Sequence, residues 1–206
     1  MNAEHIEFLV EEPSAEAFLK GLLARLPLRV TYQIHAFQDK HTMLRELPKR
    51  LRGYASWIPE TYRIVILVDR DDDDCLALKA TLERIAREMG LPTHSHRNQG
   101  RYTVVNRIVV EELEAWYFGD WEAVCAAYPR VRASVPRKAR YRDPDAIQGG
   151  TWETFERILQ KAGYFRTGLR KREAAQMIVA YMDVGRNRSR SFQVLVAAVA
   201  EIDSDP

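Results

Sequence analysis

The sequence predicts an α/β protein in which a mostly parallel, Rossmannoid sheet is flanked by helices, with a helical extension at the C-terminal end. In the first 110 residues, short apolar segments rich in β-branched residues alternate with helical patterns. The segment Ile64–Val68 is apolar throughout, as expected of a parallel strand covered on both faces. The chain has 206 residues, which is enough for one domain with a substantial core.

Four strands are expected in the first half, at segments that alternate apolar with polar residues or are continuously apolar: His5–Val10, Arg29–Phe37, Tyr62–Val68 and Tyr102–Val110. Three helices are expected between them: Ser14–Leu26, Met43–Leu51 and Asp74–Met89. Ser14 is predicted to cap the first helix, and Pro48 to shift or kink the second. This order predicts helices on both faces of the sheet.

The second half is predicted to be helical apart from one long loop at 129–150, which is rich in Arg, Pro and Gly. Helices are expected at five segments: Glu111–Phe118, Trp121–Tyr128, Trp152–Ala162, Leu169–Met182 and Phe192–Ile202. We therefore predict an α/β core at residues 1–128 and an extension at 129–206 that packs on it to form a single domain.

Composition excludes several classes of protein. The longest apolar runs are far shorter than the roughly 20 residues of a membrane span, so no membrane association is expected. The N-terminus has no basic region that would mark a signal peptide. Cys75 and Cys125 are too few for a disulfide framework, and both are expected to be reduced thiols. A cytoplasmic protein is the expectation.

Acidic residues follow three of the predicted strands, and they are the candidate metal ligands: Glu11, Asp69, Asp71, Asp73, Glu112 and Glu114. Ligands of open parallel sheets bind beyond the carboxyl ends of the strands, so carboxylates from different strands could converge there. Converging carboxylates repel unless a cation neutralises them, and Mg²⁺ or Mn²⁺ prefers oxygen ligands. If the chain stays extended after Val68, Asp69 and Asp71 would point the same way and reach one ion.

Other interpretations of these acids stay open. Each group alone is explained as well by a helix dipole or a solvated helix face. An EF-hand fails, because its Gly and Glu positions counted from Asp69 hold Asp74 and Ala80. A phosphatase with an aspartyl nucleophile lacks a supporting downstream pattern, whereas a metal-binding Asp-x-Asp of a nucleotide-sugar transferase remains open.

With these residues in view, the chain resembles the Toprim superfamily, the metal-binding domain of topoisomerases, primases and the overcoming-lysogenization-defect (OLD) nucleases. Toprim domains carry a Glu after the first strand and an Asp-x-Asp after a later one, which here are Glu11 in Leu9–Pro13 and the pair Asp69 and Asp71. More closely, it resembles a prokaryotic Toprim-like family of unknown function near the OLD nucleases. The matching motifs are Glu112–Trp116 with Asp120, and the Ser-x-Ser-Phe stretch Ser189–Phe192.

The sequence departs from the resembled pattern at two points. Glu12 stands where Gly usually follows the first Glu, and Ala15, with Glu16 beside it, stands where OLD-like members often carry a second acid. The resemblance implies phosphodiester chemistry assisted by one or two Mg²⁺ ions. The residues it implies for metal binding and catalysis are Glu11, Asp69, Asp71 and Glu114. We add Lys171 to the predicted catalytic residues on the need for positive charge, and an exposed helix charge stays open as the alternative for Lys171 and for Arg190. Lys171 and Arg190 are predicted to supply positive charge near the scissile phosphate.

The densest basic stretch is Arg130–Arg142, where six of thirteen residues are Lys or Arg and none is acidic. Such a stretch suits a phosphate backbone, because arginine binds phosphate oxygens in a bidentate way. The residues predicted to bind nucleic acid are Arg137, Lys138, Arg140, Arg142 and Arg190. A solvated loop explains the same composition, so this alternative stays open.

Three functions are compatible with the sequence. The first is a Mg²⁺-dependent phosphodiesterase or nuclease acting on nucleic acid. The second is a non-catalytic Toprim-like subunit that binds nucleic acid or an ATPase in a separate chain, since this sequence has no Walker motif. The third is a metal-dependent enzyme acting on a small phosphorylated substrate. Trp116 and Phe192 are predicted to pack in the core in each case.

Overall fold

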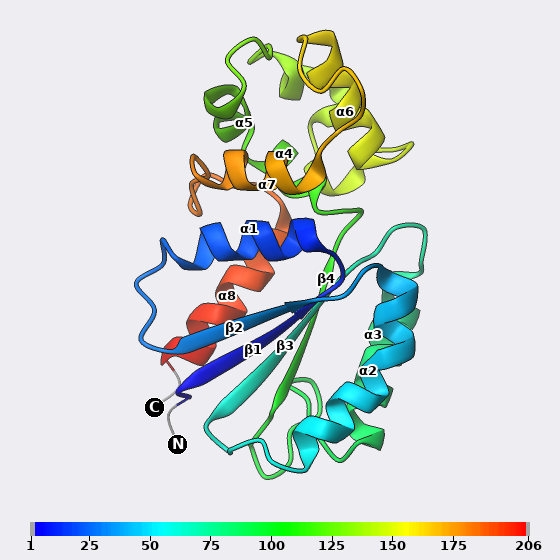
Figure 1. Cartoon of the computed structure of the whole chain (residues 1–206), viewed down its shortest axis with the longest axis vertical. Coiled ribbons are helices and arrows are strands. Elements are labelled where there is room, and N and C mark those ends of the chain that lie inside the picture. Colours follow the sequence, from blue (N-terminus) through cyan, green and yellow to red (C-terminus); the bar gives the residue numbers. More distant parts are fainter. Residues whose placement is uncertain (1–2, 205–206) are drawn as a thin grey trace.

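A parallel sheet forms the centre of the computed structural model, which describes residues 3–204 (Figure 1). Within these residues the sheet has four strands in the order β2-β1-β3-β4. The strands are β1 (His5–Val10), β2 (Thr31–Ala36), β3 (Tyr62–Asp69) and β4 (Val104–Val109). Neighbouring strands all pair in parallel. The predicted α/β class with a parallel sheet is therefore confirmed.

Helices cover both faces of this sheet. The helix α1 (Pro13–Leu23) lies on one face together with α8 (Arg190–Ser204), and α2 (Lys40–Ala55) and α3 (Cys75–Glu88) lie on the other (Figure 1). Alternate residues of β3 point to opposite faces, as strand geometry requires. Val65 and Leu67 belong to the hydrophobic cluster with α1 and α8, whereas Ile64, Ile66 and Val68 belong to the cluster with α2 and α3. This double burial explains why β3 is apolar throughout.

The remaining helices form a separate group beyond the carboxyl ends of the strands (Figure 1). They are α4 (Glu114–Gly119), α5 (Trp121–Ala127), α6 (Thr151–Lys161) and α7 (Lys171–Val179). Their buried residues join the same hydrophobic cluster as α1 and α8, so the extension and the sheet share a core. No helix in residues 3–204 combines the length and the hydropathy needed to cross a membrane.

Three predicted features differ in detail. Helix α1 begins at Pro13, so Ser14 lies in its first turn and donates to the Glu12 carboxylate instead of capping the backbone. Helix α2 continues through Pro48, because Met43, Leu47 and Leu51 bury one face of it against the sheet. Segment 129–150 is packed and not an open loop: it has three short 3₁₀ turns, Val135–Arg137, Ala139–Tyr141 and Pro144–Ala146.

The packing of α1 against α7 leads to a first prediction. A Cβ atom at Gly21 would lie 2.3 Å from Cγ1 of Val179. The branched Val side chain has little freedom to turn away, so Gly21→Ala is expected to lower the free energy of unfolding by about 1–3 kcal/mol. At Gly53 in α2, no atom of the described residues lies within 4 Å of the corresponding Cβ, so Gly53→Ala should stabilise the protein by up to about 1 kcal/mol. Urea unfolding measures both, and equal effects would contradict the close approach.

A buried carboxylate joins α3 to β4. Glu83 accepts hydrogen bonds from the Asn106 side chain, at 2.9 Å, and from the Thr93 hydroxyl, and it pairs with Lys79 at 3.2 Å. Burial alone would raise the pKa of Glu83, but these hydrogen bonds outweigh it and lower the pKa to about 2. The ionised carboxylate therefore stabilises the folded state.

The second prediction follows from this pKa. Because the folded pKa lies below the ordinary value of 4.5, the stabilisation is fully present above pH 4.5 and is lost as the pH falls toward 2. Glu83→Gln should cost about 1–3 kcal/mol at neutral pH and flatten the dependence of stability on acid pH. The control is Glu88→Gln, since Glu88 is exposed on the same helix and pairs only with Arg84 among the described residues. Unfolding at a series of acidic pH values tests this, and parallel curves for wild type and Glu83→Gln would refute it.

Candidate active site

The strand order places a switch point between β1 and β3. The chain leaves β1 through α1 on one face of the sheet and leaves β3 through α3 on the other face. Open α/β sheets bind their ligands at such a point, beyond the carboxyl ends of the strands. Glu11 follows β1 directly, and Asp69 is the last residue of β3. Two of the predicted residues therefore lie at the position where this topology favours a site.

Glu11 and Asp69 are neighbours in space. The Asp69 backbone N–H donates to Oε2 of Glu11 at 3.0 Å, and Oδ2 of Asp69 accepts from the Leu113 N–H at 3.3 Å. Asp69 is buried, and burial followed by the charges of Glu11 and Glu114 raises its pKa well above the ordinary value. Burial also raises the pKa of Glu11 to about 7, with Asp71 adding to the effect. In both carboxyl groups, burial and the neighbouring negative charges therefore destabilise the ionised form.

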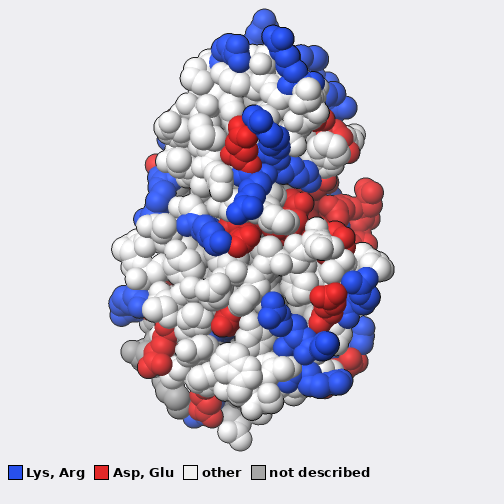
Figure 2. All heavy atoms as spheres, viewed as in Figure 1, with Lys and Arg blue, Asp and Glu red and all other residues white. Residues whose placement is uncertain are grey.

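Glu114 completes this group from the first turn of α4. Its side chain is buried, and neither carboxylate oxygen has a hydrogen-bond partner among the described residues. Burial raises the pKa of Glu114 to about 7, although the positive charge of Lys171 acts against this. We call Glu11, Asp69, Asp71 and Glu114 the acidic cluster. The loop after β3 adds four exposed acidic residues, Asp71–Asp74. Asp and Glu side chains gather in one patch at the edge of the surface in Figure 2.

Lys171, the first residue of α7, faces the acidic cluster. Its Nζ lies 3.9 Å from Oε1 of Glu12 and 5.2 Å from the centre of the Trp152 ring. Burial lowers the pKa of Lys171, but the charges of Glu114, Glu12, Glu112 and Asp69 outweigh burial and raise it. The structure therefore brings the predicted cation to the predicted acids, from a helix far along the chain.

Asp71 and Asp73 are arranged differently from the expectation. Asp71 has a φ of 48°, so the chain turns after Asp69 and does not stay extended. Lys40, at the start of α2, pairs with Asp71 at 2.7 Å and with Asp73 at 2.9 Å. The assumption that Asp69 and Asp71 project side by side from an extended segment is wrong. Asp71 still lies close enough to raise the pKa values of Glu11 and Asp69.

Glu112 and Arg190 have other partners. Oε2 of Glu112 accepts from the Thr151 hydroxyl at 2.7 Å and from the Trp152 N–H at 2.8 Å, which holds the start of α6. Arg190 begins α8, is exposed, and donates its backbone N–H to Asp145 at 2.5 Å. Across residues 3–204 no hydrogen bond or ion pair joins the Arg190 side chain to the acidic cluster.

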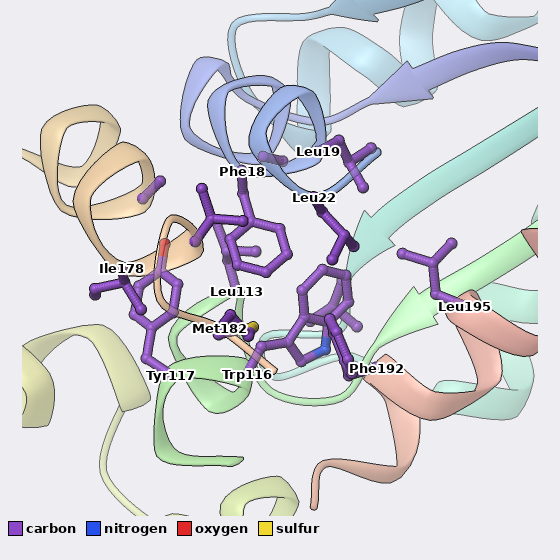
Figure 3. Packing of buried hydrophobic residues seen from close by; sticks show 14 of the residues in the cluster. Phe18, Leu19, Leu22, Leu113, Trp116, Tyr117, Ile178, Met182, Phe192 and Leu195 are labelled. Atoms are coloured by element: carbon purple, nitrogen blue, oxygen red, sulfur yellow. The ribbon is translucent and has the colours of Figure 1, made fainter. Parts of the chain in front are cut away.

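The two motifs of the second half contact each other in the hydrophobic core, where Trp116 and Phe192 lie side by side (Figure 3). Nε1 of Trp116 donates to the Ser191 hydroxyl at 2.9 Å, and the Trp116 and Phe192 rings lie 5.4 Å apart. Asp120 is buried and bound by the Arg186 guanidinium, at 2.6 Å and 3.0 Å. These motifs therefore anchor α4, whose first residue is Glu114, to α8 and to the turn before it.

Three residues near the acidic cluster were not predicted to belong to the site. Glu12 pairs with Lys171, and Lys40 neutralises Asp71 and Asp73. The Tyr117 hydroxyl is buried without a partner in the described chain, and burial, followed by the charge of Glu114, raises its pKa. Tyr117 stands three residues after Glu114 on one helix, so helical spacing could have found it. No sequence signal links Lys40 to the acids.

The oxygen atoms of the acidic cluster meet part of what a divalent cation needs. Within residues 3–204, no three His, Cys, Asp or Glu side chains are already arranged to hold an ion, since Glu11 is bound to the Asp69 amide and Asp71 to Lys40. The two unpartnered oxygens of Glu114, buried beside Asp69, nevertheless fit a cation, because buried carboxylates are normally paired or bound to metal. All donors are oxygens, which suits Mg²⁺ or Mn²⁺.

Fold and site together define the class: an α/β protein with a parallel sheet that carries a buried acidic cluster at the switch point. The chain belongs to the family described as a domain of unknown function (DUF4276), whose model matches residues 10–200. Among solved structures, it is similar to the C-terminal region of the Burkholderia pseudomallei OLD protein. That match has 15% identity and a TM-score of 0.47, and covers 97% of this chain and 100% of that one. No curated protein matches the sequence.

Proposed function

We propose that this protein is a Mg²⁺- or Mn²⁺-dependent phosphodiesterase that acts on nucleic acid. The observation that carries the proposal is Glu114, whose two buried carboxylate oxygens have no hydrogen-bond partner within residues 3–204 and lie near Asp69 and Lys171. Leaving such groups unpaired is costly, so a protein retains them where a ligand completes them. Their place at the switch point of the sheet supports a binding site.

Glu11, Asp69 and Glu114 would hold the cation, and Asp71 and Asp73 would join them once Lys40 turns away. When bound, the cation supplies polarisation of a phosphoryl oxygen and activation of water. Lys171 neutralises negative charge on the phosphate, since it stays protonated beside the acids. Glu112 positions α6 through Thr151 and Trp152.

A polyanionic substrate is supported by exposed basic residues on the helical extension. Arg137, Lys138, Arg140 and Arg142 are exposed along one segment, and Arg190 is exposed at the start of α8. Contacts between such residues and phosphates release counterions, so affinity for nucleic acid should fall with salt. We propose that these five residues form the contact to the phosphate backbone.

A cleavage panel tests the proposal. Plasmid, linear duplex, single-stranded DNA and RNA are each incubated with the protein in Mg²⁺, in Mn²⁺ and in EDTA. Cleavage with either ion and none in EDTA is expected. A metal-dependent rise in melting temperature without cleavage of any polynucleotide would favour a small phosphorylated substrate. Absence of both cleavage and the melting shift would favour a non-catalytic subunit.

A further inference from the structure

A second hollow lies in the helical extension, away from the acidic cluster. It has a volume of about 910 Å³ and is enclosed by the segment 130–148 and one side of α6. This volume is within the range of roughly 300–1,000 Å³ that is typical of ligand sites. We call it the α6 cavity, and no residue of the acidic cluster lines it.

The wall of the α6 cavity is strongly basic. Among the described residues, one acidic side chain, Asp143, and six cationic ones line it; the cations are Arg130, Arg132, Lys138, Arg140, Arg157 and Lys161. None of the six pairs with an Asp or Glu in the described part of the chain; Arg130 donates to the Gly163 carbonyl and Arg157 to the Thr154 hydroxyl. Like charges gathered without counter-charges favour an anion with several negative charges.

The cavity also offers surfaces for an apolar, flat group. Val131, Ile147 and Ile158 line it beside the cations. Two of the guanidinium groups lie over aromatic rings, with Cζ of Arg130 at 4.2 Å from the Tyr164 ring centre and Cζ of Arg140 at 4.6 Å from the Tyr141 ring centre. A flat guanidinium plane can stack on a nucleobase, while its N–H groups bind phosphate oxygens. An inorganic anion would leave the apolar wall unused.

We propose that the α6 cavity binds a free nucleotide with two or more phosphate groups. The cations bind the phosphates, and the base lies against the apolar wall and the guanidinium planes. This inference involves none of the residues of the acidic cluster. It shares Lys138 and Arg140 with the proposed phosphate-backbone contact, so the test compares a free nucleotide with an oligonucleotide.

The segment supplies matched variants for a test. Lys138 and Arg140 line the cavity, whereas Arg137 and Arg142 are equally exposed neighbours that do not. The double variants Lys138→Ala/Arg140→Ala and Arg137→Ala/Arg142→Ala each remove two positive charges. A further pair on α6, Arg157→Gln/Lys161→Gln, removes two charges from the opposite wall. Calorimetric titration measures binding of ADP, inorganic pyrophosphate and a single-stranded oligonucleotide to each.

ADP should bind the wild type more tightly than pyrophosphate. Both cavity variants should weaken ADP binding by at least ~10-fold, while Arg137→Ala/Arg142→Ala and Asp69→Asn bind ADP like wild type. Failure of ADP to bind, or equal weakening by the cavity pairs and the Arg137/Arg142 pair, would overturn the proposal. So would tighter binding of the oligonucleotide with loss in the same cavity variants, which would assign the cavity to the nucleic-acid contact. If the melting curve shows that one cavity variant does not fold, ADP binding to the other cavity variant tests the proposal.

Discussion

Replacement of Asp69 by Asn is expected to abolish metal-dependent phosphodiester cleavage while leaving the fold intact. Asp69 feels the charges of both Glu11 and Glu114, and Asn has nearly the same shape and keeps an oxygen that can accept from the Leu113 N–H. Loss of the charge removes a proposed ligand, so cleavage should fall by about 10²-fold or more. Loss of a buried negative charge among others should leave the metal-free protein at least as stable as wild type.

Melting curves and cleavage assays, each with and without Mg²⁺, test this expectation. Wild type should melt at a higher temperature with the ion, because a ligand that binds only the native state stabilises it. Asp72→Asn is the control, since Asp72 is exposed in the same loop and its replacement removes the same charge. The metal site would be refuted if wild type showed no shift and Asp69→Asn melted like wild type under both conditions.

Replacement of Trp116 by Ala should lower the free energy of unfolding by about 3–5 kcal/mol. Trp116 is fully buried between Phe18 of α1 and Phe192 of α8, with ring centres 5.2 Å and 5.4 Å away, and its indole N–H is bound to Ser191 (Figure 3). The truncation would create a cavity and leave that hydroxyl without its donor.

The control for this variant is Trp57→Ala, because the Trp57 side chain is 57% exposed. Its effect on urea unfolding should be much smaller than that of Trp116→Ala. The structural role of Trp116 would be disproved if both variants kept full stability and Trp116→Ala alone lost substrate binding.

The sheet was the most predictable part of the fold, because strand periodicity and continuous burial are local properties of the chain. The expected segment His5–Val10 is β1, and Tyr62–Val68 is β3 apart from one residue. The extent of α2 was not predictable, because Pro48 favours a break locally and only contacts with the sheet override it. The packing of segment 129–150 also depends on distant partners, such as Asp145, whose carboxylate binds the Ser189 hydroxyl and the N–H groups that begin α8.

The positions of site residues were predictable from the sequence where the topology of the sheet alone determines them. Glu11 and Asp69 are adjacent because parallel strands bring their carboxyl ends to one edge. The place of Lys171 and Glu112 depends on how the extension folds back, which no short motif encodes. The arrangement of Asp71 depends on a left-handed backbone and on Lys40, which comes from another helix.

Helix α8 has a consequence for how the protein is made. It packs against β4 and binds the segment before β2 through Asp203, which accepts from the Arg29 and Val30 N–H groups. During synthesis on the ribosome, β1–β4 therefore emerge long before the helix that completes one face of their sheet. Chains grow at roughly 5–20 residues per second, so the part of this apolar face that α8 covers stays exposed for several seconds, although α1 is already made. We expect nascent chains stalled before Arg190 to be bound by chaperones, and chains extended past Ser204 to be released.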